Sequence, residues 1–249
     1  MAKRCPVFVA VVVIVSVLGA LVSAGTAAST VIFVFGDSLA EVGNNNHLQY
    51  SLVRSDYPWY GIDFTGRKAT DSEKLGVSSP PPYLSLSQND DAILQGLIML
   101  PIQRLTFDDQ INYFKKAKER IRAKIGEAVA NKLCNEATYF VGIGSNDYVN
   151  NFLQPFLEDG QQYTHDEFVE LLTSKLEQQF SRLYWLGARR ILYHGIGPLG
   201  CIPSQRVKSK TGQCLKRVNE WVMEFNSKKL VDSLPSSACA PPSLPPTPH

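Results

Sequence analysis

The chain has 249 residues, of which 44% are hydrophobic and 19% are charged. This length suffices for one α/β domain with a full-sized core, and the composition excludes a wholly disordered chain. The formal charge is +2, but Lys3 and Arg4 lie in residues 1–24, which contain no acidic residue, so the remainder is formally neutral. A neutral balance gives no reason to expect nucleic acid or an anionic membrane as a partner.

Residues 1–24 have the organisation of an export signal. A short basic start precedes an unbroken run of apolar and small residues at 7–22, and small residues follow up to Ala24. Cleavage is expected there, or equally at Ala27 or Ala28. The alternative is an uncleaved anchor, but a run of 16 residues is shorter than the roughly 20 needed to span a bilayer. We therefore expect a secreted protein without an integral membrane span.

Export leaves four cysteines in the mature chain: Cys134, Cys201, Cys214 and Cys239. Four cysteines allow three full pairings. Cys201 and Cys214 flank a loop-like stretch and are the favoured disulfide, which would stabilise the fold by roughly 3 kcal/mol. The sequence contains no Cys-x-x-Cys and no histidine pair at helical spacing, so no metal or cofactor is expected.

Buried strands and amphipathic helices alternate along the mature chain. Continuous β-prone runs at 31–35, 138–143 and 190–194 predict strands buried on both faces. The clearest helix begins at a capping box formed by Thr164 and Glu167 and ends at Gly187. Further helices are predicted at 107–125 and 214–230. This alternation predicts an α/β fold with a mostly parallel sheet covered on both sides.

Two of the predicted strands end in polar residues. Asp37 and Ser38 follow the first strand, and Asn146 and Asp147 follow the second. Ligands bind at the carboxyl ends of strands in such sheets, so Ser38 is a candidate nucleophile and Asn146 a candidate donor to an oxyanion. Taken alone, Gly-Asp-Ser at 36–38 is also an ordinary turn, and Asn-Asp at 146–147 is an ordinary loop. Together, at matching strand ends of an exported α/β chain, they favour a hydrolase.

Four segments carry a resemblance to a known family. They are residues 33–39 (FVFGDSL), 43–46 (GNNN), 141–148 (VGIGSNDY) and 197–203 (GPLGCIP). They resemble the plant GDSL esterase/lipases of the SGNH hydrolase superfamily, over most of residues 30–230. The resemblance implies a three-layer α/β/α flavodoxin-like fold with a parallel sheet.

The resemblance also implies hydrolysis of carboxylic esters, of lipid or acyl type, in the apoplast or cell wall. By the family pattern Ser38 is the nucleophile, and the Ser38 backbone N–H and the Asn146 side chain are oxyanion donors. Supporting positions that match the pattern are Gly36, Asp37, Gly144 and Asp147. The expected partner is a small-molecule or lipid ester.

Two departures from the family pattern concern catalysis. The family's glycine-rich second block is expected near residues 96–103, where the sequence has GLIMLP, so this oxyanion loop is expected to be deleted. The family's general base is a histidine in Asp-x-x-His, and none of the four histidines has an Asp three residues before it; they are His47, His165, His194 and His249. His165 and His194 are the alternatives for a replacement base.

The expected organisation is a signal peptide at 1–24, an SGNH/GDSL domain at 30–234 that is incomplete at its C-terminus, and a disordered tail at 235–249. The tail holds 6 of the 15 prolines. The expected function is a secreted GDSL-type esterase/lipase with impaired activity, because a serine without an imidazole keeps an alcohol's high pKa. The alternative is an inactive pseudo-enzyme or a ligand-binding remnant.

Overall fold

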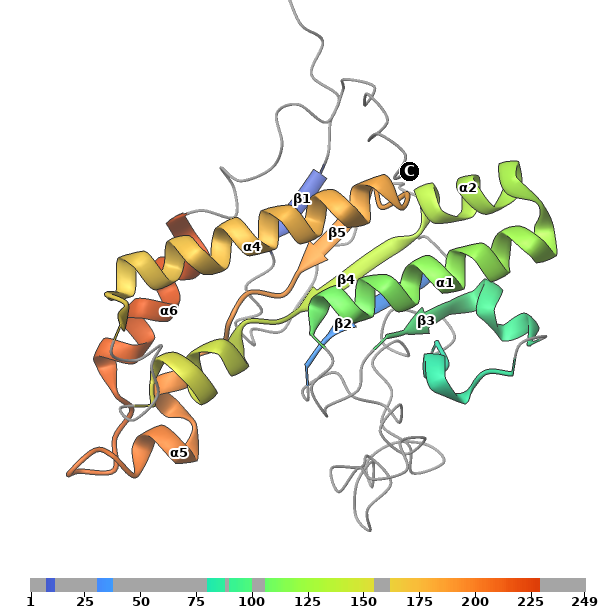
Figure 1. Cartoon of the computed structure of the whole chain (residues 1–249). Coiled ribbons are helices and arrows are strands. Elements are labelled where there is room, and N and C mark those ends of the chain that lie inside the picture. Colours follow the sequence, from blue (N-terminus) through green and yellow to red (C-terminus); the bar gives the residue numbers. More distant parts are fainter. Residues whose placement is uncertain are drawn as a thin grey trace, which may run out of the picture.

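The computed structural model describes residues 8–11, 31–37, 80–87, 90–99, 106–154 and 162–228. Five strands form one sheet, and every pairing in it is parallel (Figure 1). The spatial order is β1-β5-β4-β2-β3. The strands are β1 (Phe8–Val11), β2 (Ile32–Gly36), β3 (Gly96–Ile98), β4 (Thr138–Gly142) and β5 (Arg190–Tyr193). The parallel sheet and its helices confirm the predicted α/β class.

The long helices begin at side-chain caps that the sequence encodes locally. The α-helices are α1 (Phe107–Ile125), α2 (Glu127–Glu136), α4 (His165–Trp185), α5 (Pro203–Arg206) and α6 (Lys216–Lys228). Thr106 and Thr164 form capping boxes at α1 and α4, in which each threonine hydroxyl accepts the N–H of the third helical residue. Gly187 follows α4 with φ of 115°, as predicted for a C′ glycine.

Shorter helical segments complete the described part. A π-helix, η6 (Asp147–Phe152), follows β4 directly. The 3₁₀ segments are η4 (Tyr83–Ser85), η5 (Asp91–Gln95) and η7 (Leu199–Cys201). Isolated π-helical turns are rare and occur frequently at functional sites.

Helices α1 and α4 lie along one face of the sheet (Figure 1). Phe114 on α1 packs edge-on against Phe33 on β2, with ring centroids 4.8 Å apart, and Phe180 on α4 packs against Tyr193 on β5. Asp108 joins the two helices, because its carboxylate pairs with Lys175 at 3.3 Å and with Arg182. Aromatic packing and this ion-pair group therefore fix both helices over the strand ends.

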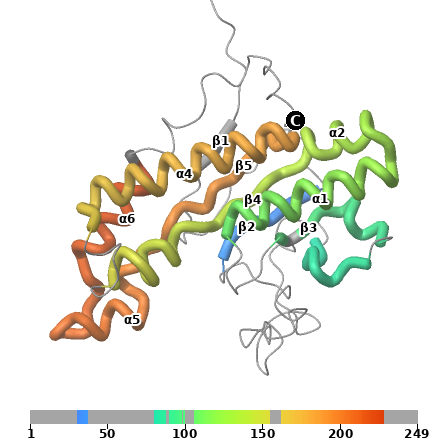
Figure 2. Tube along the Cα trace, in the orientation of Figure 1, coloured from blue at the N-terminus to red at the C-terminus, as the bar shows by residue number. Residues whose placement is uncertain are grey.

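The order of the strands creates a switch point at β2. The chain passes from β2 to β3 on one side of it and then to β4 on the other, and Figure 2 shows β2 and β4 side by side although they are far apart in sequence. Where the direction of winding reverses, the connections diverge and leave a crevice at the carboxyl ends of the strands. The carboxyl end of β2, where Asp37 follows, lies at this crevice.

Strand β3 was not predicted from the sequence. Gly96–Ile98, the start of the stretch GLIMLP, forms a strand parallel to β2. Gly96 has φ of 113°, and a Cβ there would lie 2.1 Å from the carbonyl oxygen of Ile32. The glycine therefore serves a close approach of two backbones at the start of this strand.

The N-terminal residues 8–11 form the edge strand β1, paired with β5. These residues belong to the segment that the sequence analysis assigned to an export signal. The predicted tail at 235–249 lies outside the described residues. None of the helices in the described ranges is long and apolar enough to cross a membrane.

The structure contains a disulfide between Cys201 and Cys214, the pair that the sequence analysis favoured. It joins η7 to the residues before α6. Cys134 is buried with a free thiol, and burial raises the pKa of this thiol. Cys239 lies outside the described part of the chain.

Candidate active site

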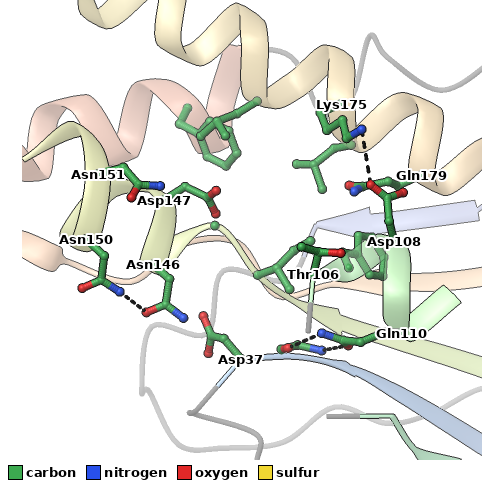
Figure 3. Close-up of a pocket in the computed structure, with 17 residues that line it drawn as sticks. Asp37, Thr106, Asp108, Gln110, Asn146, Asp147, Asn150, Asn151, Lys175 and Gln179 are labelled. Atoms are coloured by element: carbon green, nitrogen blue, oxygen red, sulfur yellow. Dashed lines mark hydrogen bonds and ion pairs between the residues drawn. The ribbon is translucent and has the colours of Figure 1, made fainter. Parts of the chain in front are cut away.

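A cavity of about 810 Å³ lies at the carboxyl ends of β2 and β4, bounded by α1 and α4 (Figure 3). Polar and apolar side chains both line it. The polar ones come from the ends of β2 and β4 and also from α1 and α4, where Asp108 and Lys175 belong to the lining. The apolar side chains are those of Phe107, Ile143, Leu172, Leu176 and Phe225. Such a mixture of polar and apolar groups is common in small-molecule sites.

Asp37 follows β2 directly and lines this cavity. Figure 3 shows its carboxylate between the end of β2 and the Asn146 side chain. Ser38, the candidate nucleophile, is the next residue and lies outside the described residues. The structure therefore places the strand end that leads into Ser38.

Gly144 and Asn146 approach the same point from β4. Gly144 has φ of 112°, and a Cβ there would lie 2.9 Å from Cδ1 of Ile196, so the tight turn after β4 needs glycine. Asn146 precedes the π-helix η6 as its N-cap residue. The side chain of Asn150 donates from Nδ2 to Oδ1 of Asn146 at 3.1 Å. Because the oxygen of the Asn146 amide is engaged in this way, its N–H groups point toward Asp37 (Figure 3).

A buried tyrosine supports the turn between β4 and η6. Tyr193 on β5 is buried, and its hydroxyl donates to the carbonyl of Ile143 at 2.7 Å. Burial, and then the carboxylates of Asp147 and Asp37, raise the pKa of Tyr193 far above its ordinary value. The hydroxyl therefore remains a donor at neutral pH and holds the peptide that precedes Gly144.

The two described histidines are engaged away from this cavity. His165 lies with Nε2 3.0 Å from the Tyr148 hydroxyl and Nδ1 3.5 Å from Glu224, and its ring stacks on Trp221. Burial, and secondarily Glu224, raise the pKa of Tyr148. His194 follows β5, with its ring 5.9 Å from that of Phe140. Neither belongs to the described lining of the cavity.

One group in the described part has the residue types of a cation site. Donor atoms of His165, Asp166 and Glu224 lie within 4.8 Å of one another, between α4 and α6. The ion pair with Glu224 and the bond with Tyr148 already occupy both ring nitrogens of His165. The group accordingly acts as a link between helices rather than as part of the cavity.

The structure brings five of the predicted site residues around one cavity: Gly36, Asp37, Gly144, Asn146 and Asp147. Ser38 lies outside the described range, as do His47 and His249. Sequence reasoning missed Gln110, Asn150 and Tyr193. For Gln110 a signal was present, since it interrupts the apolar stripe of α1 formed by Phe107, Ile111 and Phe114. For the other two, nothing local in the sequence marks them.

Comparisons with known proteins point to one family. A family model for GDSL-like lipases/acylhydrolases matches residues 32–235. A GDSL esterase/lipase of Arabidopsis thaliana is 63% identical over 233 residues, covering 83% of this chain and 65% of the relative. A second one is 36% identical over 250 residues, covering 90% of this chain and 66% of the relative. GDSL esterase/lipase 7 of the same plant is 37% identical over 225 residues, covering 79% of this chain and 62% of the relative. The chain thus spans about two thirds of the length of the curated relatives that it matches.

Proposed function

Because the chain belongs to the GDSL-like lipase/acylhydrolase family, we propose that it hydrolyses carboxylic esters with Ser38 as the nucleophile. The observation that carries this proposal is the convergence of two strand ends on one cavity. Asp37, which precedes Ser38, and Asn146 both line it at the switch point of the sheet. The Ser38 hydroxyl attacks the ester carbonyl and loses its proton to solvent, which forms a tetrahedral oxyanion. Collapse of the oxyanion breaks the ester C–O bond, and the alcohol leaves with a proton from solvent. Water then hydrolyses the acyl-serine, which releases the carboxylic acid and restores Ser38.

The oxyanion receives hydrogen bonds from two directions in this proposal. The side-chain N–H of Asn146 donates from the β4 side, and the backbone N–H of Ser38 donates from the β2 side. Asn150 already occupies the amide oxygen of Asn146, which supports this orientation of the donor. Donors fixed in advance stabilise the developing charge without reorganisation.

Turnover is slow in the proposed reaction, because a base for the Ser38 proton is missing from the described site. Both ring nitrogens of His165 have partners elsewhere, and His194 packs near Phe140. None of the four histidines in the 249 residues has an aspartate three positions before it. A serine hydroxyl that can lose its proton only to solvent keeps its high pKa. The advantage over water then comes from the oxyanion donors and binding, and it is at most roughly 10³–10⁴-fold, because the oxyanion loop is expected to be deleted.

The apolar side chains that line the cavity support an acyl group as the part of the substrate that is bound. Leu172 and Leu176 on α4 and Phe107 on α1 belong to the lining, as does Asn146. An ester whose carbonyl lies at Asn146 can therefore place its hydrocarbon part against these apolar side chains. A small-molecule or lipid ester fits such a lining.

Export is part of the proposal. The basic start and apolar run of residues 1–24 support a cleaved signal and an extracellular site of action, in the apoplast or cell wall. Strand β1 lies at an edge of the sheet and pairs on one side only, with β5. Cleavage after residue 24 therefore removes an edge strand and leaves β5, β4, β2 and β3 in place, together with the cavity at their ends.

Hydrolysis of p-nitrophenyl butyrate by the purified protein tests this function. We expect slow release of p-nitrophenol that Ser38→Ala abolishes and Asn146→Ala lowers by about 100-fold, the effect of losing one oxyanion donor. Ser227→Ala is the matched control, because the Ser227 hydroxyl bonds only to carbonyls of its own helix among the contacts described. Equal rates for the wild type and Ser38→Ala would refute the nucleophile and favour a protein that binds ligands without hydrolysing them.

A further inference from the structure

A buried glutamine holds the backbone at the end of β2. Gln110 is only 2% exposed, although it stands in the apolar face of α1. Its Oε1 accepts the N–H of Gly36 at 3.0 Å, and its Nε2 donates to the carbonyl of Gly36 at 2.9 Å. One side-chain amide thus bonds to both polar groups of a single residue 74 positions earlier in the chain.

The position of this amide pair in the sheet explains why it is needed. Strand β3 pairs with β2 only as far as Val34, whose carbonyl accepts the N–H of Met99 at 2.8 Å. The backbone groups of alternate residues point to the same side of a strand, so those of Gly36 face the β3 side beyond the last paired residue. The amide of Gln110 takes the place of the next strand residue there.

The helix that carries Gln110 is itself fixed at this end. The capping box of Thr106 and Asp109 closes the first turn of α1. Asp108 pairs with Lys175 and Arg182 on α4, and Phe107 packs against Phe35 with ring centroids 5.8 Å apart. Gln110 follows directly after this first turn of α1. The contacts of that turn with α4 and with Phe35 on β2 therefore fix the position of Gln110 relative to β2.

We infer that Gln110 is a positioning residue for the nucleophile: it fixes the peptide between Gly36 and Asp37, from which Ser38 extends. The carbonyl of Gly36 and the nitrogen of Asp37 share one peptide plane. Only the φ and ψ angles of Asp37 then separate that fixed plane from the nitrogen of Ser38. This inference rests on the proposed role of Ser38.

The matched comparison is a second amide pair in the same fold. Asn226 on α6 accepts the N–H of Ile196 at 2.9 Å and donates to its carbonyl at 2.8 Å, in the loop after β5. Asn226→Leu removes two hydrogen bonds to the backbone of Ile196, after β5. Gln110→Met removes two hydrogen bonds to the backbone of Gly36, at the end of β2. Both are expected to lower stability by similar amounts, but only Gln110 lies at the strand end that leads into Ser38.

The test measures kcat and KM for p-nitrophenyl butyrate, at a temperature where circular dichroism shows each variant fully folded. We expect Gln110→Met to lower kcat by about 10- to 100-fold, the scale of a misplaced reacting group, with KM unchanged within about twofold. Asn226→Leu should keep kcat within about threefold of the wild type. An equal loss of kcat in both variants, or none in Gln110→Met, would overturn the inference.

Gln110→Glu provides a second readout if Gln110→Met does not fold. A protonated carboxyl can accept from the Gly36 N–H and donate to the Gly36 carbonyl, whereas a carboxylate repels that carbonyl. The ratio of its kcat to that of the wild type should therefore rise as the pH falls from about 8 to 5, because burial raises a carboxyl pKa into this range. A flat ratio would contradict the inference. A wild type without any Ser38-dependent hydrolysis would instead refute the proposed function.

Discussion

Asn150 decides which way the Asn146 side chain presents its N–H groups. The two residues are four positions apart on the segment that enters η6, and the Asn150 Nδ2 donates to the Asn146 Oδ1. An asparagine amide can rotate so that either its oxygen or its nitrogen faces a site, and only the nitrogen can donate to an oxyanion. The bond from Asn150 favours the orientation that the proposed reaction needs.

Asn150→Leu should therefore lower kcat for p-nitrophenyl butyrate by about 2- to 10-fold, which corresponds to one hydrogen bond of roughly 0.5–1.5 kcal/mol. The Asn146 side chain remains present, so the loss should be smaller than that of Asn146→Ala. Gln154→Met is the control, because Gln154 bonds to the carbonyl of Val149 on the same π-helical segment and leaves Asn146 untouched. If Gln154→Met reduced kcat as much as Asn150→Leu does, a general loosening of η6 would explain both losses, and the specific role of Asn150 would be contradicted.

At the scale of elements, the capping box of α4 links helix stability to a titrating carboxylate. The backbone N–H of Thr164 donates to Glu167 at 2.8 Å and its hydroxyl donates at 2.7 Å. These bonds from Thr164 lower the pKa of Glu167 below its ordinary value of 4.5. A carboxylate with a lowered pKa contributes stability above the ordinary pKa, and that contribution is lost as the pH falls through the lowered value.

Thr164→Ala should cost about 1 kcal/mol in the free energy of unfolding at neutral pH, the usual effect of losing an N-cap side chain. The difference between wild type and variant should shrink as the pH is lowered from about 6 to 3, because protonated Glu167 no longer attracts the Thr164 donors. Urea denaturation across this range measures it, with Thr211→Ala in the exposed turn before α6 as the control. A difference that stayed constant down to pH 3 would contradict the role of the carboxylate.

The elements that could be predicted are those whose signals are local. Helix α1 begins and ends where the apolar stripe and cap of its own residues place it, and β2, β4 and β5 each fall within one residue or so of a continuous β-prone run. Strand β3 has three residues, too few for a period to be recognised. Helix α2 starts without a side-chain cap, so its N-terminus gave no signal.

The site was predictable only in part, for a similar reason. The polar residues after two buried strands could be assigned to one edge of the sheet, because parallel strands end together. Gln110 bonds to a residue 74 positions away and Tyr193 to one 50 positions away. Such contacts depend on how α1 and β5 pack in three dimensions, and no local pattern encodes them.

At the scale of the whole molecule, β1 lies at the edge of the sheet, so removal of residues 1–24 on export does not remove residues that line the cavity. The cavity lies at β2 and β4, whereas β1 pairs with β5 at the other side of the sheet. We expect the mature N-terminus of the secreted protein to lie between Gly25 and Thr30, because small residues at the end of residues 1–24 suit a signal peptidase. N-terminal sequencing checks this, and a soluble intracellular protein that retained Met1 would contradict it.

The central claim is that Ser38 is the nucleophile at the switch-point cavity, although its attack is slow. Labelling with a fluorophosphonate, which phosphonylates an attacking serine hydroxyl and needs no deacylation step, tests it most directly even where turnover is slow. The account predicts one adduct by intact mass, located on the peptide that contains Ser38, absent in Ser38→Ala, retained in Ser227→Ala and formed more slowly in Asn146→Ala. A folded protein that formed no adduct, or formed it on a different residue, would contradict the account.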